Sequence, residues 1–387
     1  MSKVRILYIT HAYYNRGGIE EHLRDLSFGL KNDFEIYILT PVISEGSQHF
    51  QLLKNDLICE IYPGNVIHSP KSELKDNLAE FALEDAIRKI KPNLIHIHHI
   101  QNWPLSIIKF ISDLEIPKVI TIHDYFLATP LYTLEFSNHP RELLSPEYSK
   151  MIFGQDISEY LKIRRNIITG SINKFNLLIT PSNNTKSEIS KIIPASYQVI
   201  HHGISQPQAR PKVLAEGKIR FGYIGSLIRQ KGLATLLEAF SKASKHLPQI
   251  ELHIFGSGYE QHDFSQSSDS TFYHGSYSRR DLPEILSSFD VGVIPSIFKE
   301  TFCYTLAEMQ HAKIPVLASR IGSLNDFITE ENGRFFAPGD IEDLIKGIEW
   351  FTENFDSKTF EIAEPKSLER MSLEYRDIYQ SLIGIQV

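Results

Sequence analysis

Residues 219–240, IRFGYIGSLIRQKGLATLLEAF, decide the fold class, because they run from an apolar strand through a glycine-containing loop into an amphipathic helix. The same alternation recurs along the chain after apolar runs such as VRILYIT, FEIYILT, KVITIHD and DVGVIPS. Apolar strands that alternate with helices are typical of a parallel sheet covered by helices on both faces. The sequence therefore predicts an α/β protein built from doubly wound, Rossmann-like domains.

One interruption divides this pattern into two domains. Residues 205–218, SQPQARPKVLAEGK, are rich in proline and polar residues and break the apolar periodicity, as linkers do. We predict one Rossmann-like domain at residues 1–204 and a second at 219–365, with a ligand in the cleft where the carboxyl ends of their strands face each other. An amphipathic helix is expected within residues 366–387, and its periodicity alone does not place it.

Composition excludes several classes of protein. The 387 residues are 42% hydrophobic, which is enough for two cores, and a net charge of −7 with scattered cations is not typical of a nucleic-acid-binding protein. No apolar run approaches the ~18 residues of a membrane span. Cys59 and Cys303 lie far apart and form no metal or disulfide motif. We expect a cytoplasmic protein that does not bind nucleic acid.

A basic segment leaves a peripheral membrane contact open. Residues 161–175, LKIRRNIITGSINKF, are mildly amphipathic and carry Lys162, Arg164, Arg165 and Lys174. Such a face permits contact with an anionic membrane that holds a lipid-linked substrate. A solvated basic face is the alternative, and the number of charges favours it.

Two glutamates eight positions apart follow the apolar strand DVGVIPS. Glu300 lies in the loop, and a helix predicted to begin at Thr301 or Phe302 carries Glu308. At 100° per residue Glu308 lies roughly 80° round the helix from Glu300, so both carboxylates can border one elongated ligand. Alternatively, Glu300 favours the helix N-terminus and Glu308 is an exposed acid. We favour a shared site, because the residues beside Glu308 are apolar and a covered carboxylate needs polar partners.

The loop after the strand IRFGYI combines flexible backbone with positive charge. Gly225 and Ser226 end the strand, Arg229 and Lys231 follow, and Gly232 opens the next helix. Backbone N–H groups at a helix start, together with two cations, suit a phosphate or diphosphate. The glycine spacing is not that of a Walker motif, and a solvated basic loop is the alternative.

Two features near the N-terminus suggest a second set of contacts. Gly17 and Gly18 separate the first strand from a helix, which lets backbone N–H groups approach a ligand, although a tight turn explains them equally well. His123 ends the strand KVITI. It is a candidate acceptor contact or proton carrier, and a hydrogen-bonded core histidine is the alternative.

Three histidines on one strand raise the question of a metal. His96 and His98 point to the same side of the strand, and His99 follows. No acidic third ligand is obvious nearby, so we expect no metal site. The run IFGSG, which contains Gly256 and Gly258, is too short for a dinucleotide fingerprint and predicts a tight turn instead.

These motifs together resemble the retaining GT-B glycosyltransferases, a family often described as glycosyl transferases group 1. The resemblance covers nearly the whole chain, and its most specific part is the E-x7-E motif formed by Glu300 and Glu308 and followed by AKIPVLAS. GSLIRQKG resembles the family's diphosphate-binding loop, and GGIEEHL its N-terminal glycine loop. The family's terminal helix returns to the first domain, which would account for SLERMSLEYRDIYQSLI.

The resemblance implies a role for each residue of these motifs. Lys231 would bind the donor diphosphate, Glu308 the ribose hydroxyls and Glu300 the transferred sugar. The donor-binding residues it implies are Gly225, Ser226, Arg229, Lys231, Glu300, Thr301, Phe302, Cys303, Tyr304 and Glu308. Gly17, Gly18 and His123 would lie on the acceptor side, with His123, Glu300 and Lys231 as the catalytic residues.

The reaction implied is transfer from a nucleoside-diphosphate-sugar to a glycan or lipid-linked glycan, with retention, in bacterial-type surface polysaccharide or glycoconjugate synthesis at the inner face of the membrane. No other cofactor and no metal are expected, since the chain has no D-x-D motif. Ser226 stands where many relatives have arginine, and Cys303 stands where glycine is common. The nucleotide base and the sugar of the donor are therefore not assigned.

Other functions remain as alternatives. A nucleotide-sugar epimerase or a phosphorylase could use the same two-domain architecture. A non-catalytic nucleotide-sugar-binding scaffold is the alternative from a different class, although the intact glutamate pair argues against it. A nicotinamide-dependent oxidoreductase ranks last, because it would rest on fold analogy alone.

Overall fold

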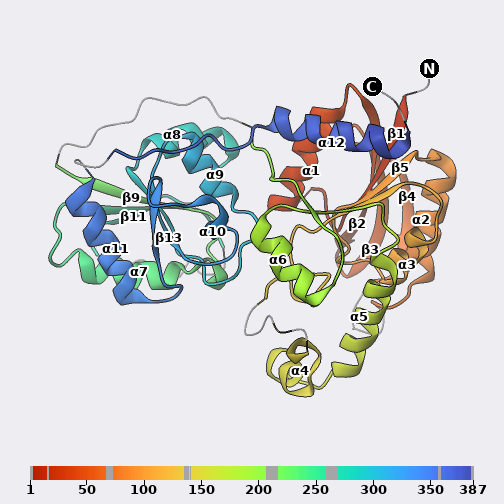
Figure 1. The fold of residues 1–387 in the computed structure, drawn as a ribbon, viewed down its shortest axis with the longest axis horizontal. Helices are drawn as coiled ribbons and strands as arrows, with labels where there is room; N and C mark the ends of the chain where they lie inside the picture. The colour runs from red at the N-terminus through yellow and green to blue at the C-terminus, as the bar shows by residue number, and fades with distance from the viewer. Residues whose placement is uncertain are drawn as a thin grey trace. The chain divides into compact units, whose positions relative to one another are not determined.

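The computed structural model describes residues 3–14, 17–66, 73–134, 139, 141–205, 217–258, 268–355 and 359–384. The chain divides into two compact units, each with its own sheet (Figure 1). The N-terminal unit comprises Met1–Gly203 with Leu368–Val387, and the C-terminal unit comprises Ile204–Ser367. Residues 206–216, most of the predicted linker, lie outside the described residues.

Within the described residues, the sheet of the N-terminal unit has eight strands in the order β4-β3-β2-β1-β5-β6-β7-β8. The strands are β1 (Val4–Ile9), β2 (Phe34–Ser44), β3 (Ser47–Lys54), β4 (Leu57–Gly64), β5 (Leu94–Ile97), β6 (Lys118–Thr121), β7 (Leu177–Thr180) and β8 (Gln198–Val199). From β2 to β8 neighbouring strands are parallel, whereas β3 and β4 add an antiparallel extension. The sequence did not predict this extension, because polar residues such as Gln48 and Gln51 interrupt the apolar run of β3 and most of β4 is not buried.

The described residues of this unit also form α-helices. They are α1 (Gly18–Leu30), α2 (Asn77–Ile90), α3 (Ser106–Ser112), α4 (Pro146–Phe153), α5 (Ser158–Ile172), α6 (Asn183–Ile192) and α12 (Leu368–Ile383). The blue α12 lies beside the red α1, although the two are far apart in sequence (Figure 1). Tyr375 and Tyr379 of α12 are fully buried in the core of this unit. A Cβ atom on Gly29 would lie 1.9 Å from the Ser372 Oγ, so glycine permits this close packing of the two helices.

In the C-terminal unit the described residues form a parallel six-stranded sheet in the order β11-β10-β9-β12-β13-β14. Its strands are β9 (Ile219–Ile224), β10 (Ile250–Phe255), β11 (Thr271–Tyr273), β12 (Val291–Ile294), β13 (Val316–Ser319) and β14 (Gly333–Phe336). The helices are α7 (Leu233–Ala243), α8 (Leu282–Ser287), α9 (Tyr304–His311), α10 (Leu324–Phe327) and α11 (Ile341–Asn354). These apolar strands and the helix after β9 agree with the α/β pattern expected from residues 219–240.

Both sheets reverse their strand order at one position. In the C-terminal unit β9 has β10 on one side and β12 on the other, and in the N-terminal unit β1 lies between β2 and β5. In open α/β sheets, ligands bind beyond the carboxyl ends of the strands where the order reverses. The loops after β9 and β12, and those after β1 and β5, are therefore the positions at which to look for a site.

The basic face expected on α5 does not form as the sequence suggested. Arg164 and Arg165 are 2% and 8% exposed, and both donate hydrogen bonds to carbonyl groups within residues 126–128. Lys162 and Lys174 stay exposed, each beside a carboxylate. Both expectations, membrane contact and a solvated face, are therefore wrong for Arg164 and Arg165. The two arginines are buried because the carbonyl groups of this buried loop need hydrogen-bond donors. None of the described helices is long and apolar enough to cross a membrane.

Candidate functional site

Lys231 follows β9 in a short 3-10 helix, Arg229–Lys231, directly before α7. Gly232 then adopts φ 71°, the left-handed region that favours glycine. A Cβ atom there would lie 1.9 Å from the backbone oxygen of Pro295, in the segment after β12. Glycine is therefore required for two reasons, and the loop carrying Lys231 packs directly on the segment that leads to Glu300.

Lys231 and Glu300 form an ion pair at the carboxyl ends of β9 and β12. The Lys231 Nζ lies 2.7 Å from the Glu300 Oε1, and the Ser296 Oγ donates a hydrogen bond of 2.6 Å to the same oxygen. The Glu300 residue is 4% exposed, whereas the Lys231 side chain is 29% exposed. Burial alone would lower the pKa of Lys231, but the Glu300 carboxylate raises it above its ordinary value. Lys231 is therefore positively charged at neutral pH and still reaches solvent.

The backbone of Glu300 is held by the loop after β13. The Ser323 N–H donates a hydrogen bond of 2.7 Å to the Glu300 carbonyl oxygen. Gly322 has φ 57°, and a Cβ atom on it would lie 2.5 Å from the backbone nitrogen and oxygen of Glu300. Sequence reasoning missed Ser296, Gly322 and Ser323, although Ser296 ends DVGVIPS and IGS follows the β13 strand VLAS.

The helix that carries Glu308 begins later than expected. Helix α9 starts at Tyr304, and Cys303 before it has extended backbone angles. Thr301 and Phe302 therefore lie in the loop, because the Glu300 carbonyl bonds to the loop after β13 instead of starting the helix. The predicted angle of roughly 80° between the glutamates does not apply, since Glu300 is not helical.

The other residues implied for this site lie close to the ion pair in sequence, with different exposures. Glu308 is half-buried, and its carboxylate adds to the effect of burial in raising the pKa of Tyr277. Cys303 is buried, and burial, with a smaller contribution from the Glu300 carboxylate, raises the pKa of its thiol to about 11. Ser226 and Arg229 are exposed. Both remain accessible to a ligand at the end of β9.

Two glycines bring the ends of β9 and β10 together. Gly225 has φ 148°, and its carbonyl oxygen would lie 1.8 Å from a Cβ atom placed on Gly256. A Cβ atom on Gly258 would lie 2.3 Å from the Leu227 carbonyl oxygen. The run IFGSG therefore serves close backbone packing after β10. The tight turn predicted from it stays a prediction, because residues 259–267 lie outside the described residues.

In the N-terminal unit, Gly17 precedes α1 and Gly18 is its first residue. Gly17 has φ −170°, an extended conformation that any residue adopts, so a tight turn does not explain it. A Cβ atom on Gly17 would instead lie 2.5 Å from the Glu20 Oε2. The glycine thus leaves room for a buried carboxylate at the start of the helix.

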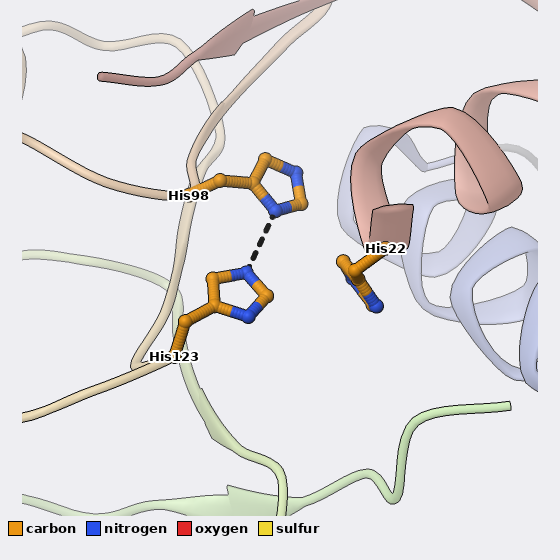
Figure 2. Close-up of side chains that lie close together, drawn as sticks. All are labelled: His22, His98 and His123. Carbon is orange, nitrogen blue, oxygen red and sulfur yellow. Dashed lines mark hydrogen bonds between the residues drawn. The ribbon is translucent and has the colours of Figure 1, made fainter. Parts of the chain in front are cut away.

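His123 follows β6 and belongs to a cluster of buried histidines. Its Nε2 lies 3.2 Å from the His98 Nδ1, and its Nδ1 lies 3.2 Å from the His202 Nε2. Figure 2 shows His22 of α1 beside His98 and His123. Burial lowers the pKa of His22 to about 3 and holds the pKa of His98 and His123 well below its ordinary value. These imidazoles are neutral at neutral pH.

A second histidine contact lies beside this cluster. The His99 Nε2 lies 3.1 Å from the Asp124 Oδ2, and Asp124 also accepts a hydrogen bond of 2.8 Å from the Phe126 N–H. Sequence reasoning missed His22 as a partner of this region. Its position four residues before Leu26, on the apolar face of α1, was the signal that could have found it.

Comparison with known families covers both units. Residues 205–362 match the family model Glycosyl transferases group 1, and residues 16–206 match the model Glycosyltransferase Family 4. A sulfoquinovosyl transferase of Arabidopsis thaliana is 24% identical over 272 residues, which are 67% of this chain and 49% of that protein. The chain thus spans about half the length of this curated relative.

Solved structures share the fold at low sequence identity. Sucrose-phosphate synthase from Thermosynechococcus elongatus superposes with a TM-score of 0.69 at 16% identity, covering 99% of this chain and 100% of that one. The catalytic domain of starch synthase IV from Arabidopsis thaliana, bound to ADP and acarbose, gives a TM-score of 0.65 at 14% identity over 99% and 100% of the two chains. Such likeness establishes the arrangement of elements.

Proposed function

The chain belongs to the glycosyltransferases and has the GT-B fold, and we propose that it transfers a sugar from a nucleoside-diphosphate-sugar to a glycan or lipid-linked glycan acceptor. The predicted fold, two Rossmann-like domains of the GT-B type, is thereby confirmed, and of the predicted family the GT-B glycosyltransferase part is supported, whereas retention stays a proposal. The observation that carries the proposal is the Lys231–Glu300 ion pair, because it places a cation and a carboxylate together where the strand order of the C-terminal unit reverses.

Lys231 is suited to the leaving group. When the bond between sugar and diphosphate breaks, negative charge grows on the diphosphate. A fixed cation stabilises that charge more in the transition state than in the ground state, which is the condition for catalysis. Many relatives have an arginine at the position of Ser226. Arg229, exposed in the same 3-10 helix as Lys231, would supply the second positive charge instead.

Glu300 is suited to the sugar. Among the described residues, its hydrogen bonds from Lys231 and Ser296 both use Oε1. A carboxylate has about four lone-pair positions, so Oε2 retains capacity for sugar hydroxyls. The backbone bond to Ser323 keeps the side chain in place before the sugar arrives. Glu308, half-buried on α9, would bind the ribose hydroxyls.

The remaining parts of the proposal concern stereochemistry, setting and metal use. We assign retention of the anomeric configuration and a place in surface polysaccharide or glycoconjugate synthesis at the inner face of a membrane. The diphosphate charge would be met by Lys231, Arg229 and the amides at the start of α9, so donor cleavage would need no divalent ion. His123 would contact the acceptor or the transferred sugar.

The test measures transfer by Glu300→Gln and Lys231→Ala. Each should lower the transfer rate at least about 100-fold, the scale of a lost transition-state contact. Lys242→Ala and Glu342→Gln are matched controls, because these two residues form an exposed ion pair of 3.4 Å in the same unit. Full activity in both site variants would contradict the proposal. Conversion of the donor without any acceptor would indicate an epimerase instead.

A further inference from the structure

Three buried histidines of the N-terminal unit converge from three elements. His22 lies on α1, His98 follows β5 and His123 follows β6 (Figure 2). One ring nitrogen from each lies within 4.8 Å of those of the other two. The residues are 0%, 1% and 7% exposed. Imidazole nitrogens gathered at this distance, out of contact with solvent, form the usual beginning of a transition-metal site.

Hydrogen bonds leave this cluster incompletely satisfied. Among the described residues, neither ring nitrogen of His22 has a hydrogen-bond partner, and the His98 Nε2 has none. Leaving a buried polar group unpaired is unfavourable, because it has lost its hydrogen bonds to water. For His123 the alternative considered was a core histidine held by hydrogen bonds. That explanation does not apply to His22, whose ring nitrogens have no such bonds among the described residues. A bound metal ion, which accepts lone pairs from ring nitrogens, would account for the burial of His22.

The spacing between His98 and His123 fits a shared ion. Their facing nitrogens are 3.2 Å apart. Two nitrogens bound to one tetrahedral zinc ion at about 2.0–2.1 Å would be separated by about 3.3 Å. The hydrogen bond drawn in Figure 2 can therefore give way to a metal between the two rings with little movement. The imidazole of His22 approaches the same space, with its ring centre 4.8 Å from that of His123.

A neighbouring residue would orient one of the ligands. The other ring nitrogen of His123, Nδ1, lies 3.2 Å from the His202 Nε2. Metal-binding histidines almost always donate a hydrogen bond through their second nitrogen, and this fixes the ring and its tautomer. His202 would accept that bond.

We propose that His22, His98 and His123 bind one divalent transition-metal ion of the zinc class. The ion would connect α1 to the ends of β5 and β6 and would stabilise the N-terminal unit. With the ion bound, both ring nitrogens of His123 are occupied, so this role replaces the acceptor contact proposed above for His123. The site is separate from the diphosphate contacts, which all lie in the C-terminal unit, and it does not depend on them. From the sequence, a metal was considered only for His98 with its neighbours on the strand and was not expected, because His22 and His123 lie far from His98 in the chain.

The experiment measures zinc uptake directly. Full-length protein without a histidine tag is stripped with a chelator, and zinc binding is followed by equilibrium dialysis. Cobalt(II) serves as a spectroscopic probe, because its visible absorption reports nitrogen coordination. The key variant is His22→Phe, which keeps a ring of similar size and removes both nitrogens. The control is His253→Phe, which alters a close histidine pair of the C-terminal unit, where His253 Nδ1 lies 3.0 Å from His274 Nε2.

The wild-type protein and His253→Phe should each bind one zinc ion tightly, with a higher melting temperature in zinc. In His22→Phe the affinity should fall at least about tenfold, since even the loss of an orienting partner has that effect. If His22→Phe does not fold, His98→Gln provides the same comparison. The proposal is wrong if the wild-type protein binds no stoichiometric zinc, or if it and the folded cluster variant bind zinc equally.

Discussion

The Nζ of Lys231 lies 2.7 Å from the Oε1 of Glu300, although the two residues are 69 positions apart. The contact joins the loop after β9 to the loop after β12, at the position where the strand order reverses. It also makes the two residues energetically dependent on each other. A loss of activity in either single variant therefore has to be separated from a loss of folding.

A double-mutant cycle makes that separation. Lys231→Ala leaves the buried Glu300 carboxylate without its cation, which should lower the free energy of unfolding by about 1–3 kcal/mol. Lys231→Ala/Glu300→Gln should recover part of this loss, because the neutral amide needs no counter-charge. Activity should remain low in Lys231→Ala, in Glu300→Gln and in the double variant. Urea denaturation supplies the stabilities, and strictly additive effects would show that the pair is not coupled.

Gly232 should tolerate no side chain. In Gly232→Ala, the strain at φ 71° adds about 1–2 kcal/mol, and the contact with the Pro295 carbonyl adds overpacking of about 1–3 kcal/mol. Gly275→Ala is the matched control, because Gly275 has φ 81° with no neighbouring atom within 4 Å. The difference in melting temperature between the two variants isolates the contact. Equal losses would mean that the loop carrying Lys231 does not pack as described.

Cys303 should react slowly with alkylating reagents at neutral pH. Its thiol has a pKa of about 11, raised mainly by burial, so at pH 8 only about one molecule in a thousand holds the reactive thiolate. The alkylation rate in a Cys59→Ser background should rise about tenfold for each pH unit between pH 7 and 9. A rate that levels off below pH 9 would indicate a lower pKa and a different environment.

Cys303 should also influence which donor is used. The side chain lies directly before α9, where the family commonly has glycine, and its thiol is near the ion pair. Cys303→Gly should widen this region and relax the choice among nucleotide sugars that differ at the sugar. Competition between paired donors measures the change. An unaltered preference would place the sugar away from Cys303.

Helix α12 should be required for the stability of the N-terminal unit. The Tyr379 hydroxyl lies 2.6 Å from the His96 Nδ1 and donates to the Tyr8 hydroxyl at 3.2 Å. Tyr379→Phe should therefore cost about 1–3 kcal/mol. Tyr375→Phe, which loses only a 3.4 Å contact with Thr121, should cost less. Trp103, buried in the same unit, reports unfolding by fluorescence, and a reversed order of the two variants would contradict the assignment.

The fold was largely predictable because most strands are continuous apolar runs. Val291–Ile294 and Val316–Ser319, for example, are fully buried and stand out in the sequence. The strands β3 and β4 were not predicted from the sequence, since they form an antiparallel extension in which exposed and polar residues interrupt the apolar pattern. The spacing of apolar residues along a strand indicates whether one or both of its faces are buried. Strands at the edge of a sheet are less buried, so this pattern is weaker there.

Sequence motifs selected the residues of the candidate site, whose roles stay predictions, but did not give their contacts. Motif spacing identified Lys231 and Glu300, yet their ion pair and the support from Ser296 depend on strand order, which sequence spacing does not give. The start of α9 was placed too early because a backbone bond to Ser323 holds Glu300 outside the helix. The approach of His22 to His98 and His123 likewise comes from tertiary packing alone.

The most direct test of the account is nucleotide binding to the wild-type protein and to Lys231→Ala. Melting temperatures are measured with UDP, GDP, dTDP and ADP, since a ligand that binds only the native state must raise the melting temperature. At least one nucleoside diphosphate should stabilise the wild-type protein, and the same one should stabilise Lys231→Ala much less. Stabilisation by none of the four, or equal stabilisation of both proteins, would contradict the proposal that Lys231 holds the donor diphosphate.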